Sequence, residues 1–166
     1  MTVRRSTAFV THLAIPLMAA VLTAVSAAAG PKPATITDIR AQLFYESEGT
    51  LSDNLFKQKD LALWNTIIGE GTGGGRSSST LVTVEVTGKD VPMGDVKIEV
   101  VATGDKGKVL GKTVTDVMIY DNSTKFFAPL WLGNTGCEAI KVSAKITGKN
   151  YKAAPVTKTI PFACGE

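Results

Sequence analysis

Residues 140–147 read Ile-Lys-Val-Ser-Ala-Lys-Ile-Thr, a stretch in which apolar and polar side chains alternate. Residues 82–87 repeat the pattern, with three valines separated by threonine and glutamate. Successive side chains of a β-strand point to opposite faces, so the alternation is typical of strands with one buried and one solvated face. The pattern predicts antiparallel β-structure.

Further strands are predicted on both sides of these two. They are expected near residues 35–45, 61–68, 95–103, 108–119, 124–132 and 156–162, and glycine, asparagine and aspartate turns separate most of them. A short helical turn is possible around Leu55, before the 61–68 segment. About eight short strands in one domain predict an all-β fold, an antiparallel β-sandwich that is immunoglobulin-like in the broad sense. A barrel is the alternative.

The last hairpin offers two registers. Pairing Ile140 with Phe162 keeps apolar residues on one face, whereas placing Cys137 opposite Cys164 needs a register one residue different. A slip of one residue turns every side chain to the other face. We expect the first register, with a bulge or a turn at Gly136 that lets the cysteines meet.

The two cysteines are predicted to form a disulfide, because an even number of cysteines in an exported chain indicates disulfide bonding. Cys137 and Cys164 would close a loop of about 28 residues. A reactive thiol or a metal site is the alternative. It lacks a C-x-x-C spacing and a histidine to complete a ligand set.

Residues 1–29 are predicted to be a cleavable signal peptide, followed by one domain over residues 30–166. Arg4 and Arg5 precede an apolar run at 13–25, and Ala27 and Ala29 fit an A-x-A cleavage site. An uncleaved anchor is the alternative, but the run is shorter than the ~20 residues that cross a bilayer. A twin-arginine signal is less favoured. We therefore expect a periplasmic or secreted protein with no stable membrane insertion after cleavage.

Composition narrows the chemistry of the mature chain. Its 16 basic and 15 acidic residues leave it almost neutral, which argues against nucleic acid as a partner. The one histidine of the chain, His12, lies in the predicted signal. Histidine-based triads and metal sites are therefore not expected. We predict no cofactor and no metal, and the composition favours a non-enzymatic protein over an enzyme.

A glycine- and serine-rich loop is predicted at residues 69–79. Residues 69–74 match G-x-G-x-x-G, but a strand follows them instead of the helix that a dinucleotide site requires. We interpret the segment as a flexible contact loop with Arg76 as its charged anchor.

Aromatic residues are the other weak candidates for ligand binding. Trp131 lies in the apolar stretch 126–132, which favours the sandwich core, with an exposed patch for a partner or a sugar ring as the alternative. Trp64 precedes Asn65-Thr66, and Tyr151 is expected at the exposed tip of the last hairpin.

Four acidic residues follow the first predicted strand. Glu46, Glu48, Asp53 and Asp60 are interpreted as solvated loop residues, with calcium binding or carboxylate catalysis as alternatives. The calcium-loop spacing D-x-[DN]-x-[DN]-G is missing from this segment.

Three functions remain open. The first is a non-enzymatic module that binds a protein partner or a surface polymer, such as a polysaccharide. The second is a glycan hydrolase that uses the carboxylates around Glu46. The third is a structural subunit that assembles by strand addition, although Lys158 and Pro161 make the last strand a poor edge for it.

Overall fold

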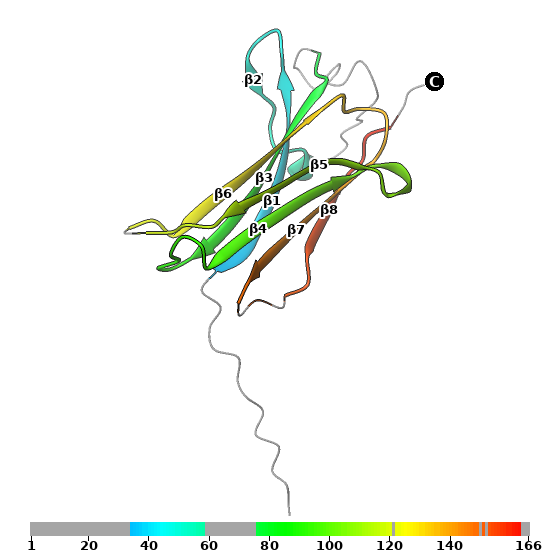
Figure 1. Ribbon diagram of the computed structural model, residues 1–166. Coiled ribbons are helices and arrows are strands. Elements are labelled where there is room, and N and C mark those ends of the chain that lie inside the picture. The colour runs from blue at the N-terminus through cyan, green and yellow to red at the C-terminus, as the bar shows by residue number, and fades with distance from the viewer. Residues whose placement is uncertain (1–33, 59–75, 121, 150, 152, 164–166) are drawn as a thin grey trace, which may run out of the picture. The chain divides into compact units, whose positions relative to one another are not determined.

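The computed structural model describes residues 34–58, 76–120, 122–149, 151 and 153–163 (Figure 1). The predicted signal at 1–29, the strand expected at 61–68, Trp64, Asp60, Cys164 and most of the 69–79 loop lie outside the described residues. No helix in the described part of the chain is long and apolar enough to cross a membrane.

Eight strands and two short 3-10 turns make up the described fold. The strands are β1 (Ala34–Tyr45), β2 (Thr50–Leu51), β3 (Ser79–Gly88), β4 (Val96–Thr103), β5 (Val109–Asp116), β6 (Lys125–Gly133), β7 (Ile140–Gly148) and β8 (Val156–Ile160). The 3-10 turns are η1 (Leu55–Lys57) and η2 (Asp105–Gly107). The predicted strands over the described residues are confirmed, as is the helical turn at Leu55.

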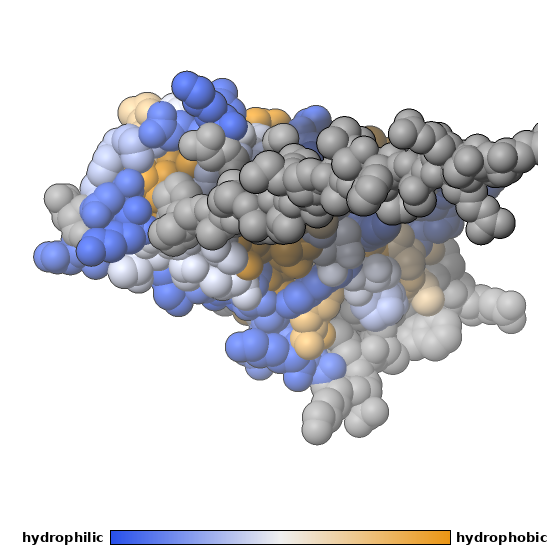
Figure 2. All heavy atoms as spheres, turned by 90° about the horizontal axis from the view of Figure 1, so that it is seen from below, coloured by the Kyte–Doolittle hydropathy of each residue, from blue (hydrophilic) through white to orange (hydrophobic). Residues whose placement is uncertain are grey.

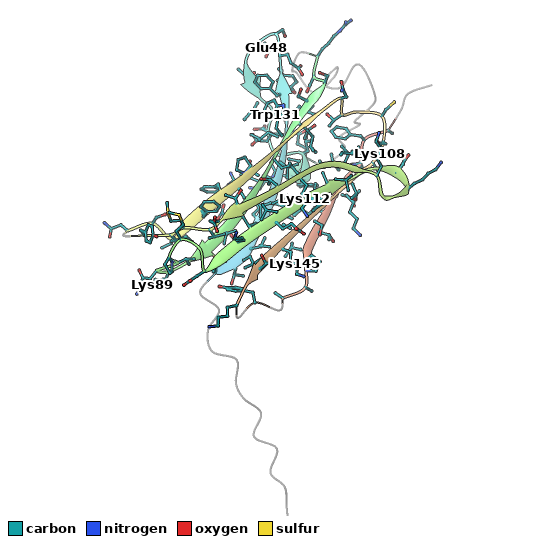
Figure 3. The ribbon with its side chains drawn as sticks, viewed as in Figure 1. Glu48, Lys89, Lys108, Lys112, Trp131 and Lys145 are labelled. Carbon is teal, nitrogen blue, oxygen red and sulfur yellow. The ribbon has the colours of Figure 1, made fainter. Side chains whose placement is uncertain are left out.

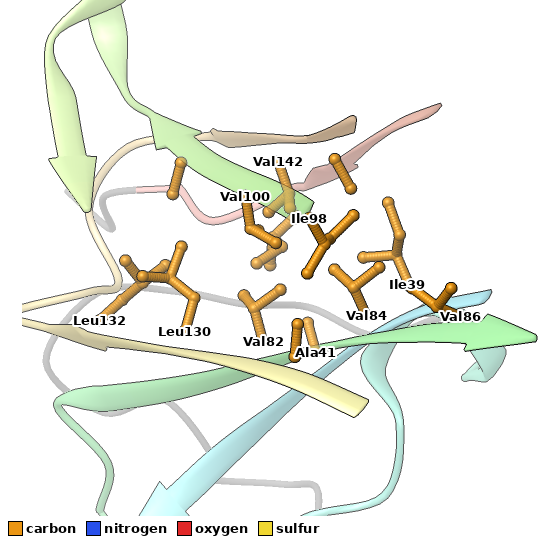
Figure 4. Packing of buried hydrophobic residues seen from close by; sticks show 14 of the residues in the cluster. Ile39, Ala41, Val82, Val84, Val86, Ile98, Val100, Leu130, Leu132 and Val142 are labelled. Carbon is orange, nitrogen blue, oxygen red and sulfur yellow. The ribbon is translucent and has the colours of Figure 1, made fainter. Parts of the chain in front are cut away.

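The strands form two antiparallel sheets, ordered β2-β1-β3-β6 and β5-β4-β7-β8. Together they make the predicted β-sandwich (Figure 1). Its core is the layer of alternating aliphatic side chains between the sheets, including Val82, Val84 and Val86 from β3 and Ile98 and Val100 from β4 (Figure 4). Burying these faces against each other is the main favourable term of folding.

The two sheets approach each other closely where β5 passes β6. Gly111 of β5 lies over the inner face of β6, and a Cβ atom at this position would be 2.6 Å from Leu132 Cδ2 and 3.3 Å from Leu130 Cδ1. A side chain there would have to displace the core, so this closed side of the sandwich depends on a glycine.

The outward edge of β1 is covered by side chains. Asn54 Oδ1 accepts a hydrogen bond from Ala41 N at 3.2 Å, and Ser52 Oγ accepts one from Leu43 N at 2.9 Å. Lys158 reaches across from β8 and donates to Ile39 O at 2.8 Å. Backbone groups that would otherwise be open to another strand are thus bonded within the chain.

The register expected for the last hairpin is wrong by two residues. Ile140 pairs with Ile160, and Val142 pairs with Lys158, which takes an inward-facing position. A two-residue shift leaves every side chain on the same face, so hydrophobic alternation cannot detect it. The inward lysine is tolerated because β8 is an edge strand and its amino group reaches Asp38 Oδ1 at 2.9 Å.

Candidate functional site

The outer face of the β1-β3-β6 sheet carries an aromatic surface. We call Phe44, Leu81, Phe127, Pro129 and Trp131 the aromatic face. Trp131 is 50% exposed and Phe127 is 45% exposed, although both lie in a stretch that reads as core. The core expectation is therefore wrong for Trp131. Its neighbours Leu130 and Leu132 point inward and take the core positions instead.

Strand register places the members of this face in rows. Trp131 lies opposite Leu81 on β3, and Leu81 lies opposite Gln42 on β1. In the next row Pro129 lies opposite Thr83, and Thr83 opposite Arg40. Adjacent strands are about 4.8 Å apart, so Trp131 and Gln42 are about 10 Å apart across the sheet.

The Trp131 ring is held by a second aromatic ring. Phe44 packs against it edge-on, with ring centroids 5.1 Å apart and an interplanar angle of 65°. Figure 3 labels Trp131, which lies on β6, and Lys112 and Lys145, which lie on β5 and β7 of the other sheet. Edge-to-face contact is a favoured aromatic geometry, so one exposed indole has a defined position.

Charged groups on this face are paired with each other. Arg40 Nη2 donates to Glu85 Oε2 at 3.1 Å, and Lys125 Nζ bonds Glu85 Oε1 at 2.7 Å. The guanidinium of Arg40 also lies over the Phe127 ring, 5.2 Å from its centroid. The hydrogen bond from Lys125 is the main cause of a lowered pKa at Glu85, and the charge of Arg40 adds to it.

A polar hollow adjoins the face on the β1 side. It measures about 440 Å³ and is lined by Arg40, Gln42, Asp53, Asn54, Lys57 and Gln58. Asn54 Nδ2 is buried there with no hydrogen-bond partner among the described residues. The hollow therefore combines amide donors and acceptors with one carboxylate and two cationic groups.

Arg76 lines a different pocket, at the end of the sheet. This pocket measures about 530 Å³ and also includes Glu46, Ser78, Thr135 and Cys137. Glu46 Oε1 accepts hydrogen bonds from Ser78 Oγ at 2.8 Å and from Ser78 N at 3.1 Å. Burial raises the pKa of Glu46, but these hydrogen bonds and one from its own backbone outweigh burial and lower it overall.

Tyr151 lies near the other end of β1 and is partly buried against the core, contrary to the expectation of an exposed tip. Its hydroxyl accepts a hydrogen bond from Ala34 N at 2.8 Å, and burial raises its pKa. It lines a second hollow of about 430 Å³ with Gly148, where a Cβ atom would lie 2.5 Å from Asp95 O. The contacts of Tyr151 tie the start of β1 to the β7–β8 connection.

The structure thus brings Arg76 and Cys137 together but separates them from Tyr151. Phe44, Phe127 and the hollow were missed in the sequence. The spacing of four residues shows that Phe127 lies on the same strand face as Trp131, which the sequence had offered as a candidate, but not that this face is exposed. Of the acidic set, Glu46 and Asp53 fall in different hollows. Among the described residues, no three His, Cys, Asp or Glu side chains group as metal ligands do.

The outer face of the second sheet differs from the aromatic face. We call it the charged face; its ionisable residues are Lys97, Glu99, Lys112, Asp116, Lys141 and Lys145. Lys112 Nζ bonds Glu99 Oε2 at 2.8 Å, with the lysine side chain about half exposed. Figure 2 shows, on the surface seen from below, hydrophobic patches between hydrophilic ones.

No protein-family model matches the chain, and no curated protein matches it. Among solved structures, it is similar to a β-glucuronidase from glycoside hydrolase family 2, with a TM-score of 0.39 and 15% identity over 51% of this chain and 10% of that one. A family 2 glycosyl hydrolase from Bacteroides cellulosilyticus gives 0.39 and 12%, over 49% and 12%. A proposed β-galactosidase from Bacteroides fragilis gives 0.40 and 14%, over 77% and 16%. The chain spans less than a fifth of the length of each of those chains.

Proposed function

We propose that this chain is an exported, non-enzymatic binding module, and that its protein partner or surface polymer binds on the aromatic face. The observation that carries the proposal is the difference between the two outer faces. One presents Trp131 and Phe127 to solvent, and the other presents lysines and carboxylates.

Exposed aromatic rings on a sheet face favour binding for an energetic reason. Covering apolar surface gains about 25 cal/mol per Å², so two half-exposed rings leave favourable burial unused in the free protein. Tryptophan and arginine are also the residues that most often dominate binding energy at interfaces. Trp131 and Arg40 lie in neighbouring rows of this face.

An immunoglobulin-like topology is part of the proposal. Strands β1, β3 and β6 lie side by side in one sheet, and β8, β7, β4 and β5 follow one another in the other. Two antiparallel sheets with sequential strands crossing between them support this arrangement. The topology positions the face but does not define its ligand.

Export and the disulfide complete the proposal. Cleavage near Ala29 would deliver the domain to an oxidising compartment, where Cys137 and Cys164 would pair. Intact mass of the protein recovered from producing cells tests both. We expect loss of the first 29 residues, within about two residues, and a mass two hydrogens below that of the reduced chain.

Glycan hydrolysis is less well supported than binding. A general acid needs a raised carboxyl pKa, and that of Glu46 is lowered. We expect no release of reducing ends from polysaccharides above background.

The binding proposal is tested with material from the surface and extracytoplasmic space of producing cells. Immobilised mature protein is compared with Trp131→Ala and with Tyr120→Ala, an exposed aromatic residue outside the face. We expect Trp131→Ala alone to lose most of the retained protein or polymer. Equal retention by all three proteins would refute the proposal, and loss only in an Arg76→Ala variant would move the site to the Arg76 pocket.

A further inference from the structure

We propose that the ligand is a neutral polysaccharide, with one sugar ring stacked on Trp131 and neighbouring units crossing the sheet toward the hollow at Asp53 and Asn54. This inference rests on the proposed function and adds a ligand class and a direction to it. Three features carry it: the exposed ring, the internal pairing of charge and the polar hollow.

The ring provides the stacking surface. A pyranose ring has an apolar face of C–H groups, and an indole offers the largest flat apolar surface among the side chains. Trp131 is half exposed, and Phe44 contacts it edge-on. Pro129, also exposed and on the same strand face, continues the surface without a charge.

The charges favour a neutral ligand. Glu85 is bonded to both Arg40 and Lys125, and Arg40 also lies 3.9 Å from Asp38 Oδ2. An anionic polymer would have to compete with these carboxylates for the same cations. A neutral polymer can lie over them without breaking an ion pair.

The hollow provides hydrogen bonds for hydroxyl groups. It begins at Gln42 and Arg40 on β1, two strand spacings or about 10 Å across the sheet from Trp131 and Pro129 on β6, which is the span of a short oligosaccharide. Sugar hydroxyls both donate and accept, and the lining includes the acceptor Asp53, the donor Lys57 and the amide of Gln58.

A protein partner fits this surface less well. Stable protein interfaces bury about 800 Å² on each partner around an apolar centre. Here the paired charges of Arg40, Glu85 and Lys125 interrupt the apolar surface, and a polar hollow flanks it. Separate stacking positions between polar groups suit a chain of sugar units.

Affinity electrophoresis under native conditions tests the inference. The probes are four soluble neutral polysaccharides, namely hydroxyethylcellulose, mixed-linkage β-glucan, xyloglucan and galactomannan, with polygalacturonate as the acidic comparison. We expect at least one neutral probe to retard the mature protein and polygalacturonate not to. Trp131→Ala should weaken that retardation at least tenfold, which is about 1.4 kcal/mol, whereas Trp131→Phe keeps a ring and should retain part of it.

Two further variants test the direction of the ligand. Asp53→Asn combined with Lys57→Ala changes exposed groups of the hollow and should weaken binding several-fold. Val114→Ala on the charged face is the control and should bind like the wild type.

Fluorescence tests the stacking position directly. In a Trp64→Phe background, Trp131 is the remaining tryptophan, so its fluorescence should change when the retarding probe is added.

Failure of the inference is distinguishable from failure of the proposed function. If none of the neutral probes retards the protein, or if wild type and Trp131→Ala are retarded equally, the inference of a neutral polysaccharide stacked on Trp131 is refuted. If Trp131→Ala nevertheless loses a protein partner in the retention experiment, the aromatic face remains the binding surface. If both experiments show no dependence on Trp131, both proposals are wrong.

Discussion

The two outer faces of this sandwich share one backbone pattern and differ in side-chain chemistry. On both sheets every second residue points to solvent, and the inner faces are similarly aliphatic. Yet the outer positions of β6 hold Phe127, Pro129 and Trp131, while those of β7 hold Lys141, Ser143 and Lys145. The alternation of apolar and polar residues determines the fold, whereas the identity of the side chains at the outward positions determines what each face can bind.

Ion pairs also differ between the faces. The Glu85 side chain is 13% exposed and bonds two cations, whereas the Lys112–Glu99 pair is open to solvent. Exposed ion pairs contribute about 0–1 kcal/mol to the free energy of unfolding, so the ion pairs of the charged face add little to stability. The ion pairs of the aromatic face are the less exposed, and their side chains are the more fixed in position.

The largest expected effect on stability is that of the predicted disulfide between Cys137 and Cys164. Cys137 lies in the connection from β6 to β7, which passes from the aromatic sheet to the charged one. Reduction of the predicted disulfide should lower the free energy of unfolding by roughly 3–4 kcal/mol, because a loop of about 28 residues is released. Urea unfolding with and without reductant measures this. A Cys137→Ser, Cys164→Ser variant should not respond to reductant, and an unresponsive wild type would exclude the bridge.

The next effect concerns the side where the sheets meet. Gly111→Ala should destabilise the protein by about 1–3 kcal/mol, since its Cβ would press on Leu132 and Leu130. Gly133→Ala is the matched control on β6, because no atom lies within 4 Å of the Cβ position. Thermal unfolding of both variants measures the difference. Equal stability of the two would mean that β5 can move away from β6 without loss.

A matched pair of cation deletions compares the faces directly. Arg40→Ala removes a bond to Glu85 and the contact with the Phe127 ring, and should destabilise by about 1 kcal/mol. Lys112→Ala removes one exposed pair and should change stability by less than about 0.5 kcal/mol. Urea midpoints of the two variants are compared with that of the wild type. The reverse order would contradict the claim that the ion pairs of the aromatic face contribute more to stability than those of the charged face.

The smallest expected effect is the change in thermal stability at low pH that Asp38 causes. Burial raises the pKa of Asp38, but the hydrogen bond and charge of Lys158 outweigh it and lower the pKa overall. Its contribution to stability is therefore present above the pKa of an unfolded aspartate, about 4, and is lost as pH falls through the lower folded value. Between neutral pH and pH 2.5, Tm of Asp38→Asn should fall less than Tm of the wild type. Glu99→Gln on the charged face is the control and should follow the wild type.

Much of the fold was readable from the sequence because its determinants are local. The alternation at residues 140–147 predicted β7 (Ile140–Gly148) almost to the residue. The register of β8 could not be predicted from local pattern, because the contacts that accompany it are distant in sequence: Lys158 bonds Asp38 and Ile39, more than a hundred residues away. A two-residue shift keeps the faces unchanged, so the local pattern was satisfied by the wrong pairing.

The site was less predictable than the fold. Residues 126–132 are apolar throughout, which hides the alternation that places Trp131 outside and Leu130 inside. The hollow depends on η1 folding back against the edge of β1, a contact between segments that no motif connects. Arg76 is predicted as a charged anchor, and it does line a pocket, which lies at the end of the sheet beyond Phe44.

The edge-on contact between Phe44 and Trp131 has a thermodynamic consequence for recognition. An indole fixed by its neighbour has already lost rotamer entropy during folding, so a ligand does not have to supply that ordering free energy, about 0.5–1.5 kcal/mol for a side chain, when it associates. Phe44→Ala would leave the indole in place but free to rotate. The same contacts would then form with a more unfavourable entropy and a shorter bound lifetime.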